Sequence, residues 1–342
     1  MAFSSSPLRR MYLQPQTALG TVVTASGTWD PTTAKVVPHT KCDLQRNIQM
    51  IAADYKTGTG SMLAGVAGRA SGSFSISAPM MPSGVAGTKP NIDALMQNIF
   101  GVAATLVAVT SVTYNLADGG SIPFSTVVFD RSGASMTQQF GIGCTASNFT
   151  LNIGGDSYLA IDADGGCYYV LESDNWANED TAGKGSLTSS PTTEPTPSLT
   201  GTTIAAFAAS NISIGGNTMT ELISAQISGT TGRSMRTDGG GKYPVAVVQG
   251  RRSIGLRSLK FQNSDSANLS ALKVLSASKG VADVVIVQGI GAGYVVTHTL
   301  KSVQFDQTRF TENGGGMDVE FSDNPAHASA LTLIDDYKLA IT

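Results

Sequence analysis

The chain has 342 residues, a formal net charge of −3 at pH 7 and only 14% charged residues. The length accommodates about two domains with substantial cores, and the absence of a basic excess argues against tight nucleic-acid binding. Few charges, 38 glycines and abundant Ser and Thr predict a turn-rich β protein whose surface is largely covered by neighbouring subunits.

Residues 1–40 are interpreted as an N-terminal arm. The segment is Ser-rich and contains Pro7 and Pro15, yet it also carries a run of apolar and basic side chains that a solvated tail rarely needs. Two interpretations remain open: the arm folds back on its own domain, or it docks on another subunit. The docking interpretation assigns assembly contacts to Leu8, Arg9, Arg10, Tyr12 and Leu13.

Residues 41–172 are interpreted as a first module. A strand is expected from about Asn47, followed by a glycine-rich loop from Thr57 to Gly68. A loop of small residues needs a partner surface to become ordered. The bulky residues of this loop are therefore candidate assembly contacts: Met62, Leu63 and Val66.

The segment after this loop predicts a strand and then a short helix. Residues 74–77 alternate between apolar and polar, which is typical of a strand with one buried face. Apolar residues then recur at helical spacing, and Gly101 is a typical helix stop. The helical stripe consists of Ile92, Leu95, Met96 and Ile99.

The rest of the first module is predicted to be β structure ending at a linker. A hairpin turn is expected at residues 162–166, where the sequence reads Asp-Ala-Asp-Gly-Gly. Residues 173–207 are rich in Ser, Thr and Pro and are interpreted as a linker or exposed loop. Further strands are expected at 102–114, 126–129, 136–142, 149–153, 158–161 and 167–171.

Residues 208–342 are interpreted as a second module that repeats the first. Gly250-Arg251 repeats Gly68-Arg69 and is followed by a strand at 253–261. A helix capped near Ser266 is then expected, followed by strands at 281–287, 294–299, 302–310, 317–321 and 337–341, with either a strand or a helix turn at 328–335. Two diverged copies of one module explain this order, although strand-helix-strand successions are common enough to coincide by chance.

The sequence offers little for catalysis or metal binding. His39, His298 and His327 do not have metal-ligand spacing, and no cofactor motif or convergent catalytic set is found. The basic residues around Arg233 and Arg236 are interpreted as subunit contacts rather than a DNA site. We therefore expect a non-enzymatic protein without a cofactor. The three cysteines, Cys42, Cys144 and Cys167, are expected to be buried as small apolar side chains.

Three stretches carry a family resemblance: Cys42-Asp-Leu-Gln-Arg46, Gly68-Arg-x-x-Gly-Ser-Phe-Ser75 and Lys89-Pro-Asn-Ile-Asp-Ala-Leu95 with Phe100-Gly101. In these features the chain resembles the tail tube proteins of long-tailed bacteriophages. The resemblance implies a structural virion protein that stacks as rings into the tail tube, the conduit for genome ejection. It also implies that the N-terminal arm docks on another subunit.

Several expectations follow from this resemblance. The fold is expected to be mainly β (α+β), with two diverged β-sandwich or barrel modules, each with a short helix, and an N-terminal arm. The ring is expected to be a trimer with pseudo-six-fold symmetry or a hexamer. Tail tip, terminator and tape measure proteins are the implied partners, and DNA passes through the lumen without specific binding.

The protein is expected to be made in the host cytoplasm without a membrane step, because no signal peptide is visible, and to reside in the virion tail. Two alternatives remain: another virion component, such as a tail terminator or decoration protein, and a carbohydrate-binding β module. The second needs an exposed aromatic platform, for which 7% aromatic residues and two tryptophans offer little.

Overall fold

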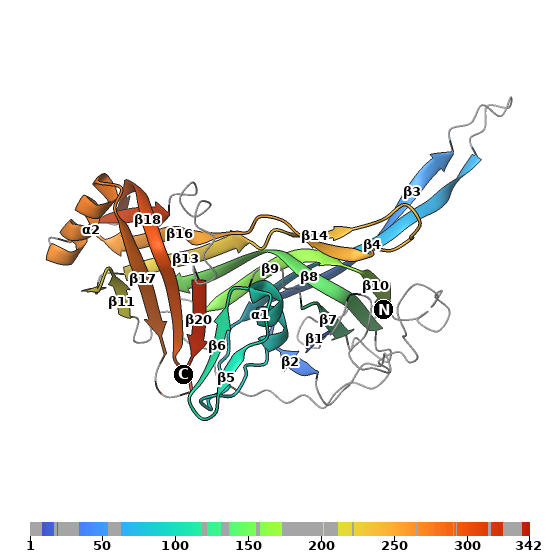
Figure 1. The fold of residues 1–342 in the computed structure, drawn as a ribbon, viewed down its shortest axis with the longest axis horizontal. Helices are drawn as coiled ribbons and strands as arrows, with labels where there is room; N and C mark the ends of the chain where they lie inside the picture. The colour runs from blue at the N-terminus through green and yellow to red at the C-terminus, as the bar shows by residue number, and fades with distance from the viewer. Residues whose placement is uncertain are drawn as a thin grey trace.

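The computed structural model shows a mainly β protein with antiparallel sheets and, among the residues it describes, one helix in each half, as the sequence predicts (Figure 1). The linker expected at 173–207 lies outside the described residues except for residue 201, as does the strand or helix turn expected at 328–335. The structure describes residues 9–16, 19, 34–53, 63–117, 122–130, 137–154, 158–172, 201, 211–220, 222–264, 266–289, 291, 293–313, 316–323 and 337–342.

The elements follow one another in a similar order in the two halves. The first half contains β1 (Arg9–Pro15), β2 (Lys35–Val37), β3 (Lys41–Ala53), β4 (Leu63–Pro79), α1 (Asp93–Phe100), β5 (Thr105–Val107), β6 (Ser111–Asn115), β7 (Phe124–Asp130), β8 (Thr137–Gly154), β9 (Ala160–Cys167) and β10 (Tyr169–Glu172). The second half contains β11 (Asn211–Ile214), β12 (Asn217–Met219), β13 (Leu222–Thr230), β14 (Arg233–Arg236), β15 (Ala246–Gln249), β16 (Ser253–Gln262), α2 (Ala267–Ala277), β17 (Val281–Gln288), β18 (Val296–Asn313), β19 (Gly316–Asp323) and β20 (Tyr337–Ile341).

The strand pairings reveal an internal duplication. In the first half, strands pair in the orders β2-β1-β7-β8-β10 and β3-β4-β9-β8. In the second half they pair in the orders β12-β11-β17-β18-β20 and β13-β16-β19-β18. Each strand of one order has a counterpart at the same place in the other. Over the described ranges, the β5–β6 hairpin is inserted in the first half alone, and the β14–β15 hairpin in the second half alone.

Equivalent strands also share short sequences. Phe149-Thr150-x-Asn152 in β8 corresponds to Phe310-Thr311-x-Asn313 in β18. Residues 161–164 in β9, Ile-Asp-Ala-Asp, correspond to residues 317–320 in β19, Met-Asp-Val-Glu. Both long strands carry a register shift just before this phenylalanine, between Ala146 and Asn148 and between Asp306 and Arg309. The two halves are therefore diverged copies of one unit.

The two copies are joined by strand pairing and share one core. β8 pairs with β13, and the C-terminal β20 pairs with β6. A single cluster of buried apolar side chains runs from Met11 in β1 to Ile341 in β20. Because paired edges and a common core tie them together, the described parts of 41–172 and 208–342 are not independent modules in space.

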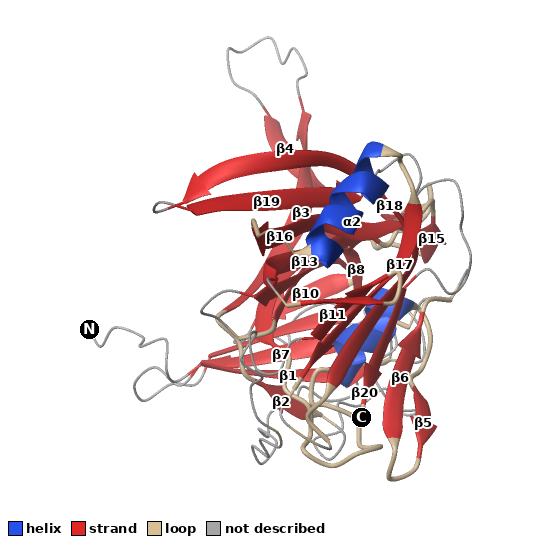
Figure 2. Cartoon of the chain, turned by 90° about the vertical axis from the view of Figure 1, so that its left-hand side faces the viewer, coloured by secondary structure: helices blue, strands red, loops and turns tan. Residues whose placement is uncertain are grey.

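Both helices form where the sequence predicts them. Gly101 ends α1 with a left-handed φ of 80°, and every residue from Ala94 to Phe100 is buried. The side chain of Ser266 accepts a hydrogen bond from the Leu269 backbone N–H and so caps α2. Figure 2 shows α2 on the outside of the molecule, beside β18, whereas α1 lies inside.

Several expected turns are instead continuous strand. Residues 162–166 belong to β9, and residues 63–68, expected in a loop, belong to β4. A Cβ at Gly165 would clash with the carbonyl oxygen of Thr145 on the neighbouring β8. Glycine is therefore needed at this position because the two strands approach closely, and not because the chain turns. Conversely, the single strand expected at 102–114 is the β5–β6 hairpin.

The N-terminal arm is part of its own chain's sheet over the described residues. β1 pairs with β7 on one side and with β2 on the other. Met11, Tyr12 and Leu13 have at most 1% of their surface exposed. For residues 9–16, the prediction of an arm that docks on another subunit is wrong. The structure matches the alternative, in which the arm folds back on its own chain. Residues 1–8 lie outside the described part of the chain.

Candidate assembly surface

The strand order β3-β4-β9-β8-β13-β16-β19-β18 forms one continuous antiparallel sheet, here called the long sheet. It crosses both copies, with the β3–β4 hairpin projecting at one end and β18 with α2 at the other (Figure 1). One face packs on the core through alternate apolar residues. These include Leu44, Phe74, Ile161, Leu151, Ile227, Leu259 and Val319.

The opposite face of the long sheet, here called the polar face, carries Ser, Thr, Asn, Gln and charged side chains. Hydrogen bonds between neighbouring strands hold many of these side chains. Asn152 Nδ2 donates to Asp162 Oδ2 at 3.0 Å, and Gln226 Nε2 donates to Asn152 Oδ1 at 3.0 Å. Further along, Ser258 Oγ donates to Glu320 Oε1 at 2.6 Å. These hydrogen-bonded side chains make this stretch of the polar face hydrophilic.

Carboxylates outnumber cations on the polar face. The carboxylates are Asp43, Asp162, Asp164, Asp318 and Glu320, and the cations that strand alternation places on the same face are Lys41, Arg69, Lys260 and Arg309. Lys260 Nζ lies 2.8 Å from Asp318 Oδ2, so one of these cations is already neutralised. Binding to nucleic-acid backbone depends on cations that release counterions from phosphate. The polar face therefore offers DNA no electrostatic trap.

In the middle of the long sheet, the copies meet at the junction of β8 and β13. Leu151 pairs with Ile227 on the core side, and both are fully buried. Asn152 pairs with Gln226 on the polar face, where their side chains are hydrogen-bonded. Apolar contact on one face and a polar bond on the other define this junction.

At the two ends of the long sheet lie the counterparts of β8 and β13, and each has an edge that pairs with no described strand. β3 is the counterpart of β13, and β18 is the counterpart of β8. Among the described residues, β3 pairs only with β4, and the 309–313 segment of β18 pairs only with β19. Ile48 on β3 is 37% exposed and Phe310 on β18 is 51% exposed, whereas Phe149, the counterpart of Phe310, is 2% exposed. Exposed edge strands with apolar side chains are sites of strand addition.

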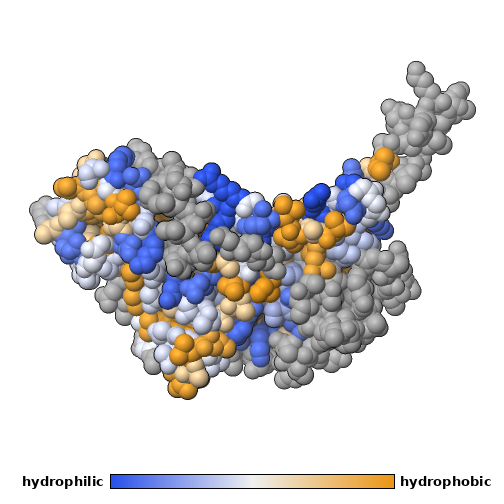
Figure 3. All heavy atoms as spheres, viewed as in Figure 1, coloured by the Kyte–Doolittle hydropathy of each residue, from blue (hydrophilic) through white to orange (hydrophobic). Residues whose placement is uncertain are grey.

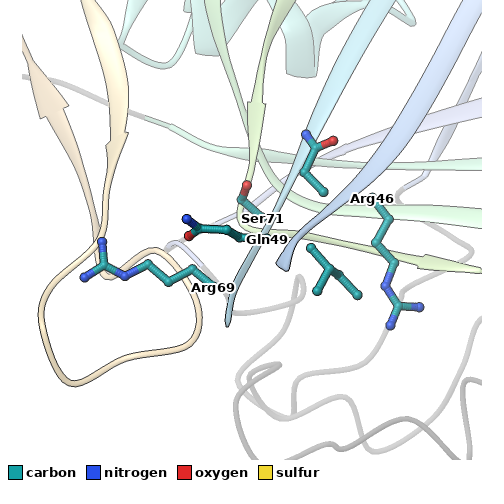
Figure 4. Close-up of a pocket in the computed structure, with 6 residues that line it drawn as sticks. Arg46, Gln49, Arg69 and Ser71 are labelled. Carbon is teal, nitrogen blue, oxygen red and sulfur yellow. The ribbon is translucent and has the colours of Figure 1, made fainter. Parts of the chain in front are cut away.

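A shallow hollow is lined by residues of the paired strands β3 and β4 (Figure 4). Arg69 points away from it and donates to Thr237 Oγ1 at 2.8 Å and to the Asp238 carbonyl at 2.9 Å, linking β4 to the β14–β15 hairpin. Arg46 points to the other side, with its guanidinium 5.3 Å from the centre of the Tyr169 ring. The lining residues are Arg46, Asn47, Ile48, Gln49, Arg69 and Ser71.

Apolar patches are distributed over separate parts of the surface. Figure 3 shows hydrophilic and hydrophobic side chains interspersed along the hollowed upper border and a hydrophobic spot on the β3–β4 hairpin, where Met50 is 64% exposed. A second apolar patch lies on the β5–β6 hairpin, at Leu106, Val107 and Val109. Two of the exposed apolar patches therefore lie on protruding hairpins.

The assembly contacts expected from the sequence fall into buried residues, half-buried residues and residues whose side chains are not described. Arg9 and Arg10 are half-buried in β1, where Arg9 donates to Gln139 Oε1 at 3.2 Å. Tyr12 and Leu13 are 0% and 1% exposed, so they are core residues and not contact residues. Their burial follows from the two strands that flank β1. Leu8 and Met62 lie outside the described residues, and Leu63 and Val66 are described only as backbone of β4.

Arg233 is also an internal residue rather than a surface contact. It is 4% exposed, donates to Gln249 Oε1 at 3.0 Å and hydrogen-bonds the Asn98 carbonyl at the end of α1. Burial, with the nearby charge of Arg252, lowers the pKa of Arg233 to about 10. Arg236 in β14 is exposed. Ile48 and Phe310 were not predicted as contact residues, and the repeated Phe-Thr pair was the signal that could have found Phe310.

The titratable residues do not converge on a reactive centre in the described part of the chain. His298 is fully buried, its Nδ1 lies 3.0 Å from the Tyr337 hydroxyl, and burial lowers its pKa to about 3. The cysteines are buried as predicted, and burial raises the pKa of Cys42 to about 12. No group of three or more His, Cys, Asp or Glu suited to a metal ion occurs among the described residues. His327 lies outside them.

Two further observations bear on the type of protein. Within the described ranges, no helix has the length and apolar character needed to cross a membrane. Comparison with known proteins does not assign a family: no protein-family model matches the chain, and no curated protein is significantly similar to it.

Proposed function

We propose that the chain is a structural, non-enzymatic subunit that assembles head to tail into hollow rings, and that these rings stack into the tail tube of a long-tailed bacteriophage. The observation that carries this proposal is the long sheet. Its two unused edges are the counterparts of the two strands that already join in its middle. Such an interface is heterologous and generates a ring when the rotation between copies closes.

The internal duplication supports a particular ring. Each chain contributes two equivalent wall segments, β3-β4-β9-β8 and β13-β16-β19-β18. If the ring has the six segments implied by the resemblance, three chains complete it with pseudo-six-fold symmetry. A ring of six chains is the competing stoichiometry.

The polar face is the proposed wall of the lumen. A conduit for DNA must contact a polyanion without holding it. Side chains that are hydrogen-bonded to one another and an excess of carboxylates meet that requirement, because few cations are available to neutralise phosphates. DNA then passes through without specific binding, and the core-side face supports the wall from outside.

The remaining parts of the proposal concern partners and location. The ends of such a tube bind a tail tip complex and a terminator protein, and the lumen holds a tape measure protein before DNA enters. The subunit is made in the host cytoplasm and then resides in the virion tail. These assignments rest on the resemblance of the sequence stretches around Gly68-Arg69 and Lys89-Pro90 to tail tube proteins.

Negative-stain electron microscopy of the purified, concentrated chain tests the proposal, with and without a tail tip complex as initiator. Hollow rings or tubes are the expected result, and native mass spectrometry of single rings then counts the chains. Three chains per ring supports the pseudo-six-fold arrangement, whereas six contradicts it. Failure to polymerise even with the initiator would overturn the tube assignment.

A further inference from the structure

We propose that β18 of one copy pairs antiparallel with β3 of the next, in the register already present at the β8–β13 junction inside each chain. This inference rests on the proposed function, because it specifies the contact that closes the ring. The partner is a second copy of this chain, and the template for the contact is present in the structure.

The register follows from equivalent positions in the two copies. In the second half, a row of paired residues crosses the long sheet through Glu320, Lys260 and Ser224. In the first half, the equivalent row crosses through Asp164, Ser75 and Asp43. Glu320 and Asp164 correspond because they end the matching segments of β19 and β9. Asp43 is therefore the counterpart of Ser224, and Asn47 is the counterpart of Ser228.

The repeated Phe-Thr pair fixes the other strand. Phe149 and Thr150 of β8 correspond to Phe310 and Thr311 of β18. Inside the chain, Thr150 pairs with Ser228. Transferring this pairing places Thr311 of one copy opposite Asn47 of the next, with Phe310 opposite Ile48 and Glu312 opposite Arg46.

The chemistry of these pairs agrees with the transferred register. Phe310 and Ile48 are the exposed large apolar residues at the centre of the two edges, and the pairing covers both. Glu312 places a carboxylate opposite the guanidinium of Arg46, which gives an opposite-charge cross-strand pair. On the polar face, Thr311 meets Asn47. Two residues further along, the sequence has asparagine at 313 and glutamine at 45, the residue types that are hydrogen-bonded at Asn152 and Gln226.

Burial within the chain supports the same conclusion. Phe149 is 2% exposed because β13 lies alongside β8, whereas Phe310 is 51% exposed because no described strand occupies the same place beside β18. The two edges lie at opposite ends of the molecule (Figure 1), so the edges of β3 and β18 in one copy cannot pair with each other. Adding the next copy gives Phe310 the environment that Phe149 already has.

Cysteine cross-linking tests the register. Thr311→Cys and Asn47→Cys introduce thiols at exposed positions, whereas the native cysteines are buried. In assembled rings, the double variant treated with a short bifunctional thiol reagent should give covalent oligomers that end at the number of chains in a ring. Each single variant should give none. The matched internal pair, Thr150→Cys with Ser228→Cys, should cross-link within one chain without an increase in mass.

A register control and the assembly assay separate the possible outcomes. Thr311→Cys with Lys41→Cys displaces the second thiol by about 20 Å along β3, so no cross-link is expected. Rings that form but cross-link only in this shifted pair, or in neither pair, would overturn the register and leave the tube proposal standing. Absence of both rings and cross-links would overturn both proposals. Covalent oligomers without hollow rings would support the edge pairing and contradict the tube.

Discussion

Phe149 and Phe310 allow the same substitution to be made in two copies of one structural unit. Phe149 is 2% exposed in the core, so Phe149→Ala removes a buried ring and leaves a cavity. The expected loss of unfolding free energy is about 3–5 kcal/mol. Phe310 is 51% exposed, so about half of the roughly 1.5–3 kcal/mol from burying such a side chain is at stake in the isolated chain, about 1 kcal/mol.

Urea unfolding at a protein concentration below that of assembly measures both losses, with an unchanged slope confirming that the same surface is exposed on unfolding. In an assembly assay, the substitution with the larger effect should be the other one. Phe310→Ala should raise the concentration needed to form rings, whereas folded Phe149→Ala protein should assemble near the normal concentration because its edges are intact. Equal losses of stability, or normal assembly of Phe310→Ala, would refute the reasoning about the free edge.

Two further predictions concern buried titratable groups. The pKa of His298 is lowered to about 3, so the unfolded chain binds an extra proton as the pH falls below about 6.5 and stability decreases from there towards pH 3, by at most about 1.4 kcal/mol per pH unit. Urea midpoints between pH 7 and pH 5 should fall more steeply in the wild type than in His298→Gln, and parallel curves would contradict this assignment. Burial raises the pKa of Cys42 to about 12 and also raises that of Cys144, so a thiol reagent should label neither in native protein at pH 8 and both after unfolding. Rapid labelling of native protein would show that this core opens readily.

Local patterns in the sequence predicted the helices well. The stripe around Leu95 with Gly101, and the cap at Ser266, determine the two helices through contacts within a few residues. Strand boundaries were predicted less well, because β8 and β18 each continue through a register shift that looks like a break in the sequence. Residues 162–166 looked like a turn, but the close approach of β8 at Gly165 is a tertiary effect.

The candidate surface was the least accessible to sequence reasoning. Tyr12 and Leu13 looked like contact residues, but β2 and β7 bury them within the chain. Arg233 looked like part of a surface cluster, yet its partners Gln249 and Asn98 lie far from it in the sequence. Whether an apolar side chain is covered depends on which strand lies beside it, and single-residue patterns do not contain that information.

β8 and β18 have a mechanical consequence. Each contributes one stretch to the long sheet and another to a second sheet, with β7 and β10 beside β8, and β17 and β20 beside β18. Each of these sheets is therefore linked to the long sheet by covalent backbone, so a shearing force between the two would have to strip the shared strand from its partners in one of them. A load applied to one layer is shared by the other, and the molecule resists sliding deformation at two separate points along its length.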